Sequence, residues 1–259
     1  MKTSLKNKWV LITGASSGFG AAAARAFGAE GAKLLLGARR IERLKKVAAE
    51  SLKAGAAAAQ AHELDVTKTS SVETFITWAK SKTRNLHVLI NNAGGAHGLE
   101  PVAQAKDEDW TWMYEANVFG LMRVTRALLP KLEAGRGHVV NVTSIAGREV
   151  YPGGAGYTAA KHAAVAVTRT LRLELAGKPV RVTDVAPGLV ETEFSLVRFP
   201  GDPERAAKVY QGLTPLVAED IADCIVWAVT RPAHVNIDEI VVKPVAQASA
   251  TVVARNQGL

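Results

Sequence analysis

Short apolar runs alternate with longer amphipathic runs along the chain, and this alternation is its strongest structural signal. The apolar runs are about four to eight residues long and rich in Val, Ile and Leu, which is typical of strands buried on both faces. The predicted strands are Lys8–Thr13, Lys33–Ala38, Ala57–Leu64, His87–Ile90, His138–Val142, Arg181–Val185 and Glu239–Val242. The predicted helices are Phe19–Glu30, Ile41–Lys53, Ser70–Lys80, Asp107–Glu133, Ala155–Ala176 and Glu219–Thr230. This order predicts an α/β fold, a Rossmann-type doubly wound parallel sheet of about seven strands with helices on both faces.

The alternation continues without a Pro-, Gly- or Ser-rich linker, so residues 1–259 are expected to form a single domain. Although 48% of the residues are hydrophobic, no apolar run reaches the roughly 18 residues that a membrane-spanning helix needs. The N-terminus, Met1–Lys8, is polar and lacks the apolar region of a signal peptide. We therefore expect a cytoplasmic protein without a membrane partner.

Charge, cysteine and histidine content exclude several classes of site. The net charge is +8, but the basic residues are scattered and form no nucleic-acid-binding pattern, so an anionic small molecule is the better partner. The one cysteine, Cys224, excludes a disulfide within the chain and is expected to be a buried structural thiol. The six histidines show no metal-ligand spacing, so no metal site is expected.

A glycine-rich segment between a predicted strand and a predicted helix has the arrangement that binds the pyrophosphate of a dinucleotide. Residues 13–20 read TGASSGFG. Gly14 would allow the tight turn, Gly18 the approach of phosphate to the backbone, and Gly20 the packing of helix on strand, while the helix N-terminus attracts anions. An ordinary strand–helix turn is the alternative. The residues expected to bind the cofactor here are Gly14, Ser16, Ser17, Gly18, Phe19 and Gly20.

Two arginines mark the end of the second predicted strand, about 20 residues after the glycine loop. Sites that prefer NAD usually place Asp or Glu there to bind the ribose 2′-hydroxyl, whereas this chain has Arg39 and Arg40. Guanidinium groups bind phosphate through two hydrogen bonds. The pattern therefore favours NADP(H), with Arg39 as the main contact of the 2′-phosphate and Arg40 in support. Two solvated arginines at the start of a helix are the alternative.

A Ser–Tyr–Lys pattern follows the fifth predicted strand. Ser144 lies just after that strand, and Tyr157 and Lys161 are four residues apart in a predicted helix, so they share one helix face. An ammonium group one turn away favours phenolate and lowers the pKa of a tyrosine from about 10. Ser144 could donate to a substrate oxygen and polarise a carbonyl. The pattern predicts acid–base catalysis, with a surface Tyr–Lys pair as the alternative.

Together with residues 91–94 (NNAG), Asn117 and Pro187-Gly188, these motifs resemble the short-chain dehydrogenase/reductase family in order and spacing over essentially the whole chain. The resemblance implies a hydride transfer between hydroxyl and carbonyl groups and a homotetramer built on the helices at 107–133 and 155–176. It implies four catalytic residues, Asn117, Ser144, Tyr157 and Lys161, with Asn117 holding a water beside the lysine. It further implies cofactor contacts from Asp65, Val66, Asn91, Ala93, Gly94, Tyr157, Lys161, Pro187, Gly188, Val190 and Thr192.

A narrower resemblance is to the NADP-dependent 3-hydroxy acid dehydrogenases. It is carried by the segments 18–20 (GFG), 187–190 (PGLV), 192–195 (TEFS), 197–199 (VRF) and 232–237 (PAHVNI). This resemblance implies a small 3-hydroxy acid such as serine, or a related small carbonyl, as substrate. The Arg148-Glu149 pair departs from the neutral residues expected in the loop before Tyr157.

Three residues are considered as substrate contacts. Arg148 and Arg198 could each bind a substrate carboxylate through a guanidinium fork, and a surface position is the alternative for both. Arg148 could also simply pair with Glu149 or another acid. His97 follows the NNAG motif and could touch substrate, with an ordinary loop position as the alternative. The tail Pro244–Leu259 could pack across a subunit boundary.

Two other functions remain open. The chain could be a broad-specificity carbonyl reductase or a biosynthetic ketoreductase for a bulky ketone. It could also be an NADP-sensing protein without turnover, although the intact Asn117, Ser144, Tyr157 and Lys161 set argues against a sensor.

Overall fold

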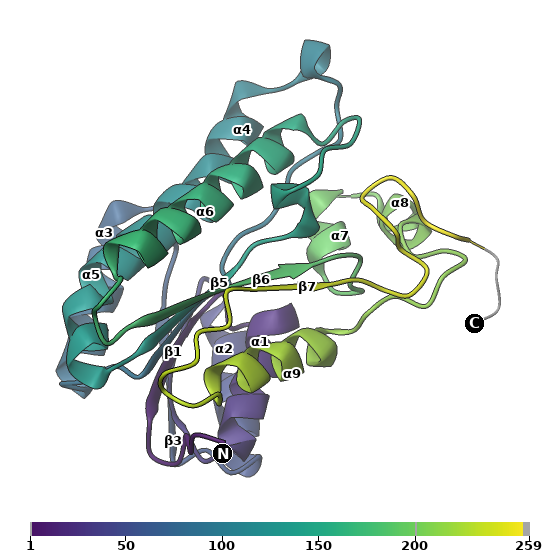
Figure 1. Ribbon diagram of the computed structural model, residues 1–259. Coiled ribbons are helices and arrows are strands. Elements are labelled where there is room, and N and C mark those ends of the chain that lie inside the picture. The colour runs from purple at the N-terminus through teal and green to yellow at the C-terminus, as the bar shows by residue number, and fades with distance from the viewer. Residues whose placement is uncertain (1, 200, 256–259) are drawn as a thin grey trace.

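Seven parallel strands form the central sheet of the computed structural model, which describes residues 2–199 and 201–255. The strands are β1 (Trp9–Thr13), β2 (Lys33–Ala38), β3 (Ala58–Glu63), β4 (Val88–Asn91), β5 (His138–Val142), β6 (Arg181–Pro187) and β7 (Glu239–Val242). Their spatial order is β3-β2-β1-β4-β5-β6-β7, so the winding direction reverses between β1 and β4. Such a reversal opens a crevice at the carboxyl ends of the strands. The predicted doubly wound sheet of about seven strands is confirmed (Figure 1).

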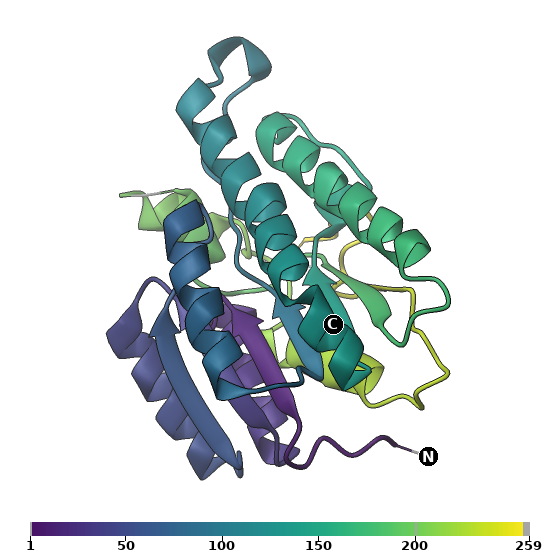
Figure 2. The same ribbon diagram turned by 90° about the vertical axis from the view of Figure 1, so that its left-hand side faces the viewer.

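Helices cover both faces of the sheet (Figures 1 and 2). One face carries α1 (Gly18–Ala29), α2 (Ile41–Lys53) and α9 (Ala218–Val229). The other face carries α3 (Thr69–Lys82), α4 (Asp107–Tyr114), α5 (Gly120–Gly135) and α6 (Ala155–Glu174). Two short helices, α7 (Phe194–Arg198) and α8 (Pro203–Lys208), lie beyond the carboxyl end of the sheet, as Figure 1 shows. None of the helices described is long and apolar enough to cross a membrane.

Alternating side chains of each strand build two separate cores, because successive residues of a strand point to opposite faces. Val10 and Ile12 pack under α1, α2 and α9, whereas Leu11 packs under α3 and α5. All three are fully buried. Burial of each such side chain contributes roughly 1.5–3 kcal/mol, which explains why the central strands β1 and β4 are almost entirely apolar up to their carboxyl ends.

Two sequence expectations need correction. The helix predicted over Asp107–Glu133 is interrupted by a π-helical turn at Glu115–Phe119, which divides it into α4 and α5. Periodicity alone does not reveal such a turn, because one extra residue shifts the helical register without ending the helix. Cys224 is only partly buried on α9 rather than enclosed in the core. Its partial burial and the neighbouring Asp223 raise the pKa of the thiol.

Candidate active site

Two clefts meet at the carboxyl ends of the strands. The first runs along the glycine loop, the end of β2 and the segment after β4. The second is a cavity of about 320 Å³ between the β5 and β6 ends, α7 and the C-terminal segment. Both clefts share the same five lining residues, Phe19, Thr143, Tyr157, Thr192 and Phe194. A ligand in one cleft would therefore meet a ligand in the other beside Tyr157.

The glycine loop is shaped for close approach of backbone segments. Gly14 has a φ of +65°, and a Cβ placed there would lie 2.8 Å from Ala93 Cα. A Cβ at Gly20 would lie 2.6 Å from Asn92 Nδ2, which donates to the carbonyl oxygen of Thr13 at 3.0 Å. Any larger side chain at these glycines would push the loop away from the segment after β4, so the sequence assignment of their roles fits the geometry.

The start of α1 is suited to an anion. Its N-cap residue, Ser17, makes no side-chain capping bond, and no acidic residue lies in the first turn. The first N–H groups of a helix have no partner within the helix, and together with the helix dipole they attract phosphate. Gly18, at the first helical position, has a φ of +51°, and a Cβ there would contact only Thr192, at 3.7 Å. The residues present therefore fit the pyrophosphate of a dinucleotide.

The far end of the first cleft carries the basic pair. Arg39, Arg40, Asp65 and Val66 line it, as the sequence predicted for the adenosine side. Arg40 donates to Ser17 Oγ at 2.6 Å and pairs with Glu193 at 2.8 Å. Arg43, which the sequence analysis did not single out, pairs with the other carboxylate oxygen of Glu193 at 2.7 Å. The two guanidinium groups lower the pKa of Glu193 against the opposing effect of its partial burial.

Ser144, Tyr157 and Lys161 come together where the clefts meet. Tyr157 and Lys161 lie on α6 and are 8% and 7% exposed. Lys161 Nζ lies 5.8 Å from the centroid of the Tyr157 ring and donates to the Val142 carbonyl oxygen at 3.1 Å. Ser144 caps the 3₁₀ turn Ile145–Gly147, its Oγ accepting from Ala146 N at 3.1 Å. The helical spacing in the sequence therefore placed the Tyr–Lys pair correctly.

Burial shifts the pKa values of both ionisable groups toward their neutral forms. It raises the pKa of Tyr157, while a hydrogen bond with Ser144 and the charge of Arg198 act in the opposite direction. Burial also lowers the pKa of Lys161 to about 8, although the nearby Asp184 carboxylate opposes that change. Arg198, rather than Lys161, is thus the cation that acts to lower the pKa of Tyr157, and burial outweighs it, so the expectation that Lys161 lowers this pKa is wrong for this structure.

Asn117 lies in the π turn and fixes the wall opposite Lys161. Its Nδ2 donates to Met113 O at 2.7 Å and to Gly95 O at 2.9 Å, and its Oδ1 accepts from Gly95 N at 3.2 Å. A Cβ at Gly94 would clash with Asn117 Oδ1 and lie 3.8 Å from Lys161 Nζ. The absence of a side chain at Gly94 therefore leaves room for Asn117 Oδ1 on the side of the segment that also faces Lys161.

Arg198 is the one predicted substrate residue that reaches the second cleft. It lies in α7, is 9% exposed, and places its guanidinium carbon 5.6 Å from the centroid of the Tyr157 ring. Nε donates to Gly98 O at 2.9 Å and Nη1 to Tyr151 Oη at 3.1 Å. Its Nη2 is buried and has no hydrogen-bond partner among residues 2–199 and 201–255. A buried donor without a partner is costly, so an anionic group beside it would be stabilised.

Two predicted substrate residues are placed elsewhere. The Arg148 guanidinium turns away from both clefts and pairs with the buried Asp184 at 2.6 Å. His97 also lines neither cleft; it stacks on Trp112 and pairs with Asp109 at 3.1 Å. Internal partners occupy both side chains, although His97 lines a small hollow together with Tyr157 and Arg198, so the expected roles of Arg148 and His97 as direct substrate contacts stay predictions.

One predicted cofactor residue also needs correction. Asn91 is 4% exposed and lines neither cleft, because its Nδ2 donates to Thr125 Oγ1 and Asn141 Oδ1 inside the fold, each at 2.8 Å. Its neighbour Asn92 lines the first cleft instead, together with Ala93 and Gly94. The two asparagines differ because Asn91 is the last residue of β4, whereas Asn92 follows the end of that strand, and successive side chains point to opposite sides.

The remaining predicted residues divide between the clefts. Thr192 lines both, while Pro187, Gly188 and Val190 line the second cleft alone. The second cleft also contains residues that the sequence analysis did not select, namely Leu99, Tyr151, Tyr210 and Gln247. Gln247 Oε1, for example, accepts from Leu189 N at 2.8 Å and so attaches the C-terminal segment to the cleft. No local motif marks these positions, because each reaches the cleft from a different loop.

The arrangement of the two clefts defines a dinucleotide-dependent oxidoreductase site, and comparison with known proteins identifies its family. Residues 8–200 match the short chain dehydrogenase family. An uncharacterized oxidoreductase of Mycobacterium tuberculosis is 54% identical, with 95% of this chain and 94% of that protein covered. The NADP-dependent 3-hydroxy acid dehydrogenase YdfG of Salmonella typhimurium is 44% identical, with 93% and 96% covered.

A solved structure agrees with these relatives. The closed form of serine dehydrogenase complexed with NADP+ superposes with a TM-score of 0.88 at 39% identity, covering 96% of this chain and 100% of that chain. The chain belongs to the short chain dehydrogenase family. It is an oxidoreductase that acts on CH–OH groups with NADP(H) as cofactor, as the sequence predicted.

Proposed function

We propose that this enzyme interconverts a small 3-hydroxy acid, such as serine, and the corresponding carbonyl compound. The observation that carries the proposal is Arg198, which lines the second cleft with its guanidinium carbon 5.6 Å from the centroid of the Tyr157 ring, and whose buried Nη2 has no hydrogen-bond partner among the described residues. Arginine recognises carboxylate through charge-assisted hydrogen bonds. A substrate carboxylate bound by Arg198 would bring the hydroxyl-bearing carbon of the same molecule, a few bonds away, next to Tyr157 Oη. The names of the relatives, 3-hydroxy acid and serine dehydrogenases, support the same class of substrate.

Each polar residue at the junction takes one role in this proposal. NADP(H), held by the glycine loop, Arg39 and Arg40, supplies or accepts the hydride when bound. Tyr157 Oη takes the hydroxyl proton in oxidation and returns a proton to the substrate oxygen in reduction. Ser144 Oγ holds that oxygen by a hydrogen bond, and Lys161 refills the proton on Tyr157 through a water that Asn117 holds. Acid–base catalysis of this kind contributes about 10²–10⁴-fold to the rate.

A broad carbonyl or ketone reductase is the alternative that the second cleft supports. Much of its lining is apolar, including Leu99, Ile145, Phe194 and Phe199, and such a surface accepts neutral ketones. Arg198 favours the acid, because a neutral ketone would leave its Nη2 without a partner.

A matched panel of substrates separates the two functions. Reduction of NADP is followed by absorbance with serine, 3-hydroxybutyrate, the methyl ester of 3-hydroxybutyrate, and a neutral secondary alcohol of the same size. Turnover of the free acids with kcat/KM at least about tenfold above that of the ester supports the carboxylate subsite, since one charge-assisted hydrogen bond is worth about 1.5–3 kcal/mol. Preference for the ester and the alcohol would establish the carbonyl reductase instead.

The assembly and location of the enzyme are proposed on the same basis. We expect a homotetramer, with α5 and α6 at a subunit interface, and a cytoplasmic enzyme that forms one domain over residues 1–259. The described part of the tail, up to residue 255, packs on its own chain, where Arg255 donates to the carbonyl oxygens of Gln211 and Val209; residues 256–259 lie outside the described residues. Light scattering of the purified protein measures the oligomeric state.

A further inference from the structure

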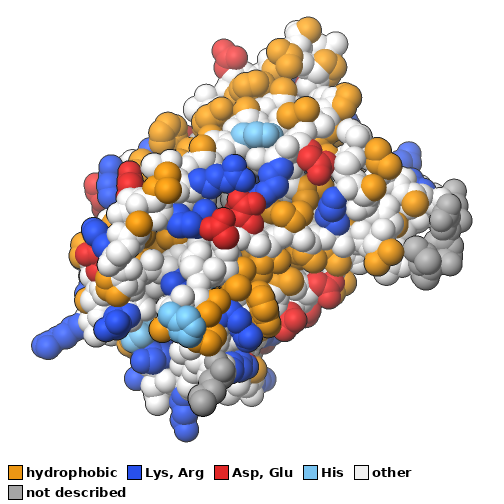
Figure 3. All heavy atoms as spheres, viewed as in Figure 1, with side chains coloured by type: hydrophobic (Ala, Val, Ile, Leu, Met, Phe, Trp, Pro, Cys, Tyr) orange, Lys and Arg blue, Asp and Glu red, His pale blue; other side chains and the backbone are white. Residues whose placement is uncertain are grey.

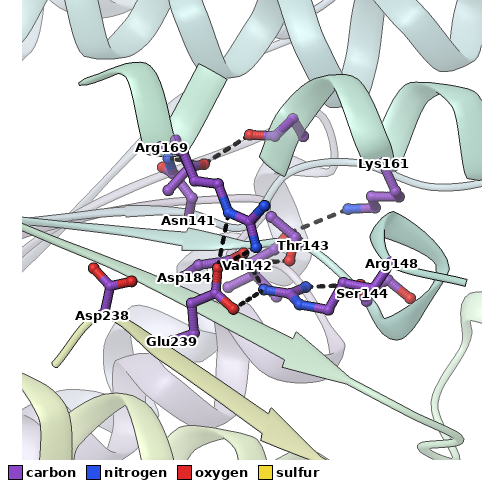
Figure 4. A network of polar contacts seen from close by, with 12 residues as sticks. Asn141, Val142, Thr143, Ser144, Arg148, Lys161, Arg169, Asp184, Asp238 and Glu239 are labelled. Carbon is purple, nitrogen blue, oxygen red and sulfur yellow. Dashed lines mark hydrogen bonds and ion pairs between the residues drawn. The ribbon is translucent and has the colours of Figure 1, made fainter. Parts of the chain in front are cut away.

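A buried ion pair lies directly behind the segment that carries Ser144. Asp184 on β6 is 1% exposed, and its carboxylate accepts from Thr143 Oγ1 at 2.5 Å and from Arg148 Nη2 at 2.6 Å (Figure 4). A buried carboxylate is tolerated only with close partners and well-formed hydrogen bonds. The position of the Arg148 guanidinium is therefore fixed by Asp184, and Thr143 is fixed with it.

The same guanidinium connects the Ser144 segment to the rest of the fold. Arg148 Nη1 donates to the Ser144 carbonyl oxygen at 3.3 Å, and Nη2 lies 3.2 Å from Glu239 Oε2 on β7. Arg169 on α6 pairs with the other oxygen of Glu239 at 2.9 Å. Figure 4 shows these groups facing one another. In Figure 3, basic and acidic side chains gather at the middle of the molecular face that the view shows.

The turn between Ser144 and Arg148 also bears on Lys161. A Cβ at Gly147 would lie 2.8 Å from the Lys161 carbonyl oxygen, so this turn packs directly on α6 at the lysine. The Lys161 ammonium donates to the carbonyl oxygen of Val142, in the strand that leads to Ser144. Residues 142–148 therefore contact the lysine at its backbone carbonyl and at the ammonium end of its side chain.

We propose that Arg148 and Asp184 are positioning residues, which hold residues 142–148 so that Ser144 Oγ and Lys161 Nζ stay aligned with Tyr157 Oη. The inference rests on the proposed function of Ser144, Tyr157 and Lys161. It gives a role to the Arg148-Glu149 departure. Arg148 secures the inner side of the loop, while the Glu149 carboxylate accepts from Ala250 N at 2.5 Å and secures the C-terminal segment that lines the second cleft.

Three variants test the positioning role through turnover. Arg148→Met should lower kcat about 10- to 100-fold, because a displacement of about 1 Å at a reacting group can cost 10²-fold, while KM and the Kd of NADPH stay within about twofold. Arg148→Lys should recover part of kcat, because lysine can pair with Asp184 without reaching the Ser144 carbonyl. Arg169→Met is the matched control, since it removes the other guanidinium from Glu239 without touching residues 142–148, and its kcat should equal that of the wild type.

Amide hydrogen exchange tests the positioning without any substrate. Peptides covering residues 142–149 should exchange about tenfold faster in NADPH-bound Arg148→Met than in the wild type, and at the wild-type rate in Arg169→Met. If circular dichroism shows that Arg148→Met does not fold, the exchange rates of Arg148→Lys are compared with those of the wild type and of Arg169→Met instead. Unchanged exchange, or an unchanged kcat in a folded Arg148 variant, overturns the positioning role. Absence of turnover in the wild type overturns the proposed function instead, and the exchange rates then decide the positioning role alone.

Discussion

The two clefts that meet at Tyr157 are built in different ways. The first cleft is made mainly of turns at strand ends, where glycine and its backbone geometry decide the shape, as at Gly14 and Gly20. The second is made of side chains from separate loops, among them Leu99, Tyr151 and Gln247. Under the proposed function, local backbone structure would bind the cofactor, whereas tertiary contacts would bind the substrate. In α/β folds loops vary while the strand framework is kept, so substrate choice can change without loss of the cofactor site.

The largest expected effect is at Tyr157, where the two clefts meet, because its replacement should affect turnover and leave cofactor binding unchanged. Tyr157→Phe should lower kcat by about 10³-fold or more, because it removes the acid–base hydroxyl. The Kd of NADPH, measured by fluorescence titration, should stay within about twofold, since the aromatic ring that lines the first cleft remains. Tyr114→Phe, at a tyrosine that lines neither cleft, is the matched control. Substantial turnover by Tyr157→Phe would remove Tyr157 from the mechanism.

Arg198→Met should affect the second cleft alone. We expect kcat/KM for a 3-hydroxy acid to fall about 100-fold, because the carboxylate loses its charge-assisted hydrogen bonds, while a neutral alcohol of the same size loses only the smaller effect of the Arg198 charge on Tyr157. Arg205→Met is the control, since Arg205 packs on the Phe199 ring at 4.4 Å but lines neither cleft. An equal loss for acid and alcohol would mean that Arg198 supports the cleft wall and binds no carboxylate.

Gly14→Ala should affect the first cleft. The new methyl group would lie 2.8 Å from Ala93 Cα, at a backbone φ of +65° that disfavours alanine. We expect the Kd of NADPH to rise about 10- to 30-fold, since a strained residue of this kind costs about 1–2 kcal/mol and here displaces the phosphate loop. Gly177→Ala is matched in backbone, with a φ of +81° and nothing within 4 Å, and should leave the Kd unchanged. An equal Kd of NADPH in Gly14→Ala and Gly177→Ala would show that the glycine loop accommodates the added methyl group.

The smallest expected effect concerns the sheet that both clefts share. His138 on β5 is 1% exposed and its Nε2 donates to Thr183 Oγ1 at 2.7 Å, because that hydroxyl itself donates to Ile237 O. Its Nδ1 has no partner among the residues described, so a second proton there would be unpaired. Burial and the nearby Arg181 charge accordingly place the pKa of His138 well below 6.5.

This shift has a definite sign in the pH dependence of stability. Below about pH 6.5 the unfolded chain binds a proton at His138 that the folded protein does not, so the free energy of unfolding decreases as the pH falls, by up to about 1.4 kcal/mol per pH unit. Urea unfolding between pH 7.5 and 5 measures the slope. His138→Gln should reduce it, whereas replacement of the exposed His234 should not. An unchanged slope in His138→Gln would assign the acid sensitivity to other groups.

Much of the fold and of the first cleft could be predicted from the sequence. Strand alternation predicted the sheet, the glycines predicted the phosphate loop, and the spacing of Tyr157 and Lys161 predicted one shared helix face. Periodicity did not predict the π turn around Asn117, where the side chain donates to Met113 O and the turn packs against α6. The partner of Arg148 could not be predicted either, since Asp184 lies on another strand.

The sequence alone therefore determined the parallel sheet, the dinucleotide loop, the preference for NADP(H) and the Tyr–Lys pair. These features depend on steric and hydrogen-bonding rules that act over a few neighbouring residues, so a local pattern is enough to specify them. Only the tertiary structure decided between Arg148 and Arg198, which the sequence left equivalent. Folding places one guanidinium on the buried Asp184 and the other over the Tyr157 ring. A loop side chain takes its role from whichever distant segment packs against it, and that choice is made by the packing of the whole chain.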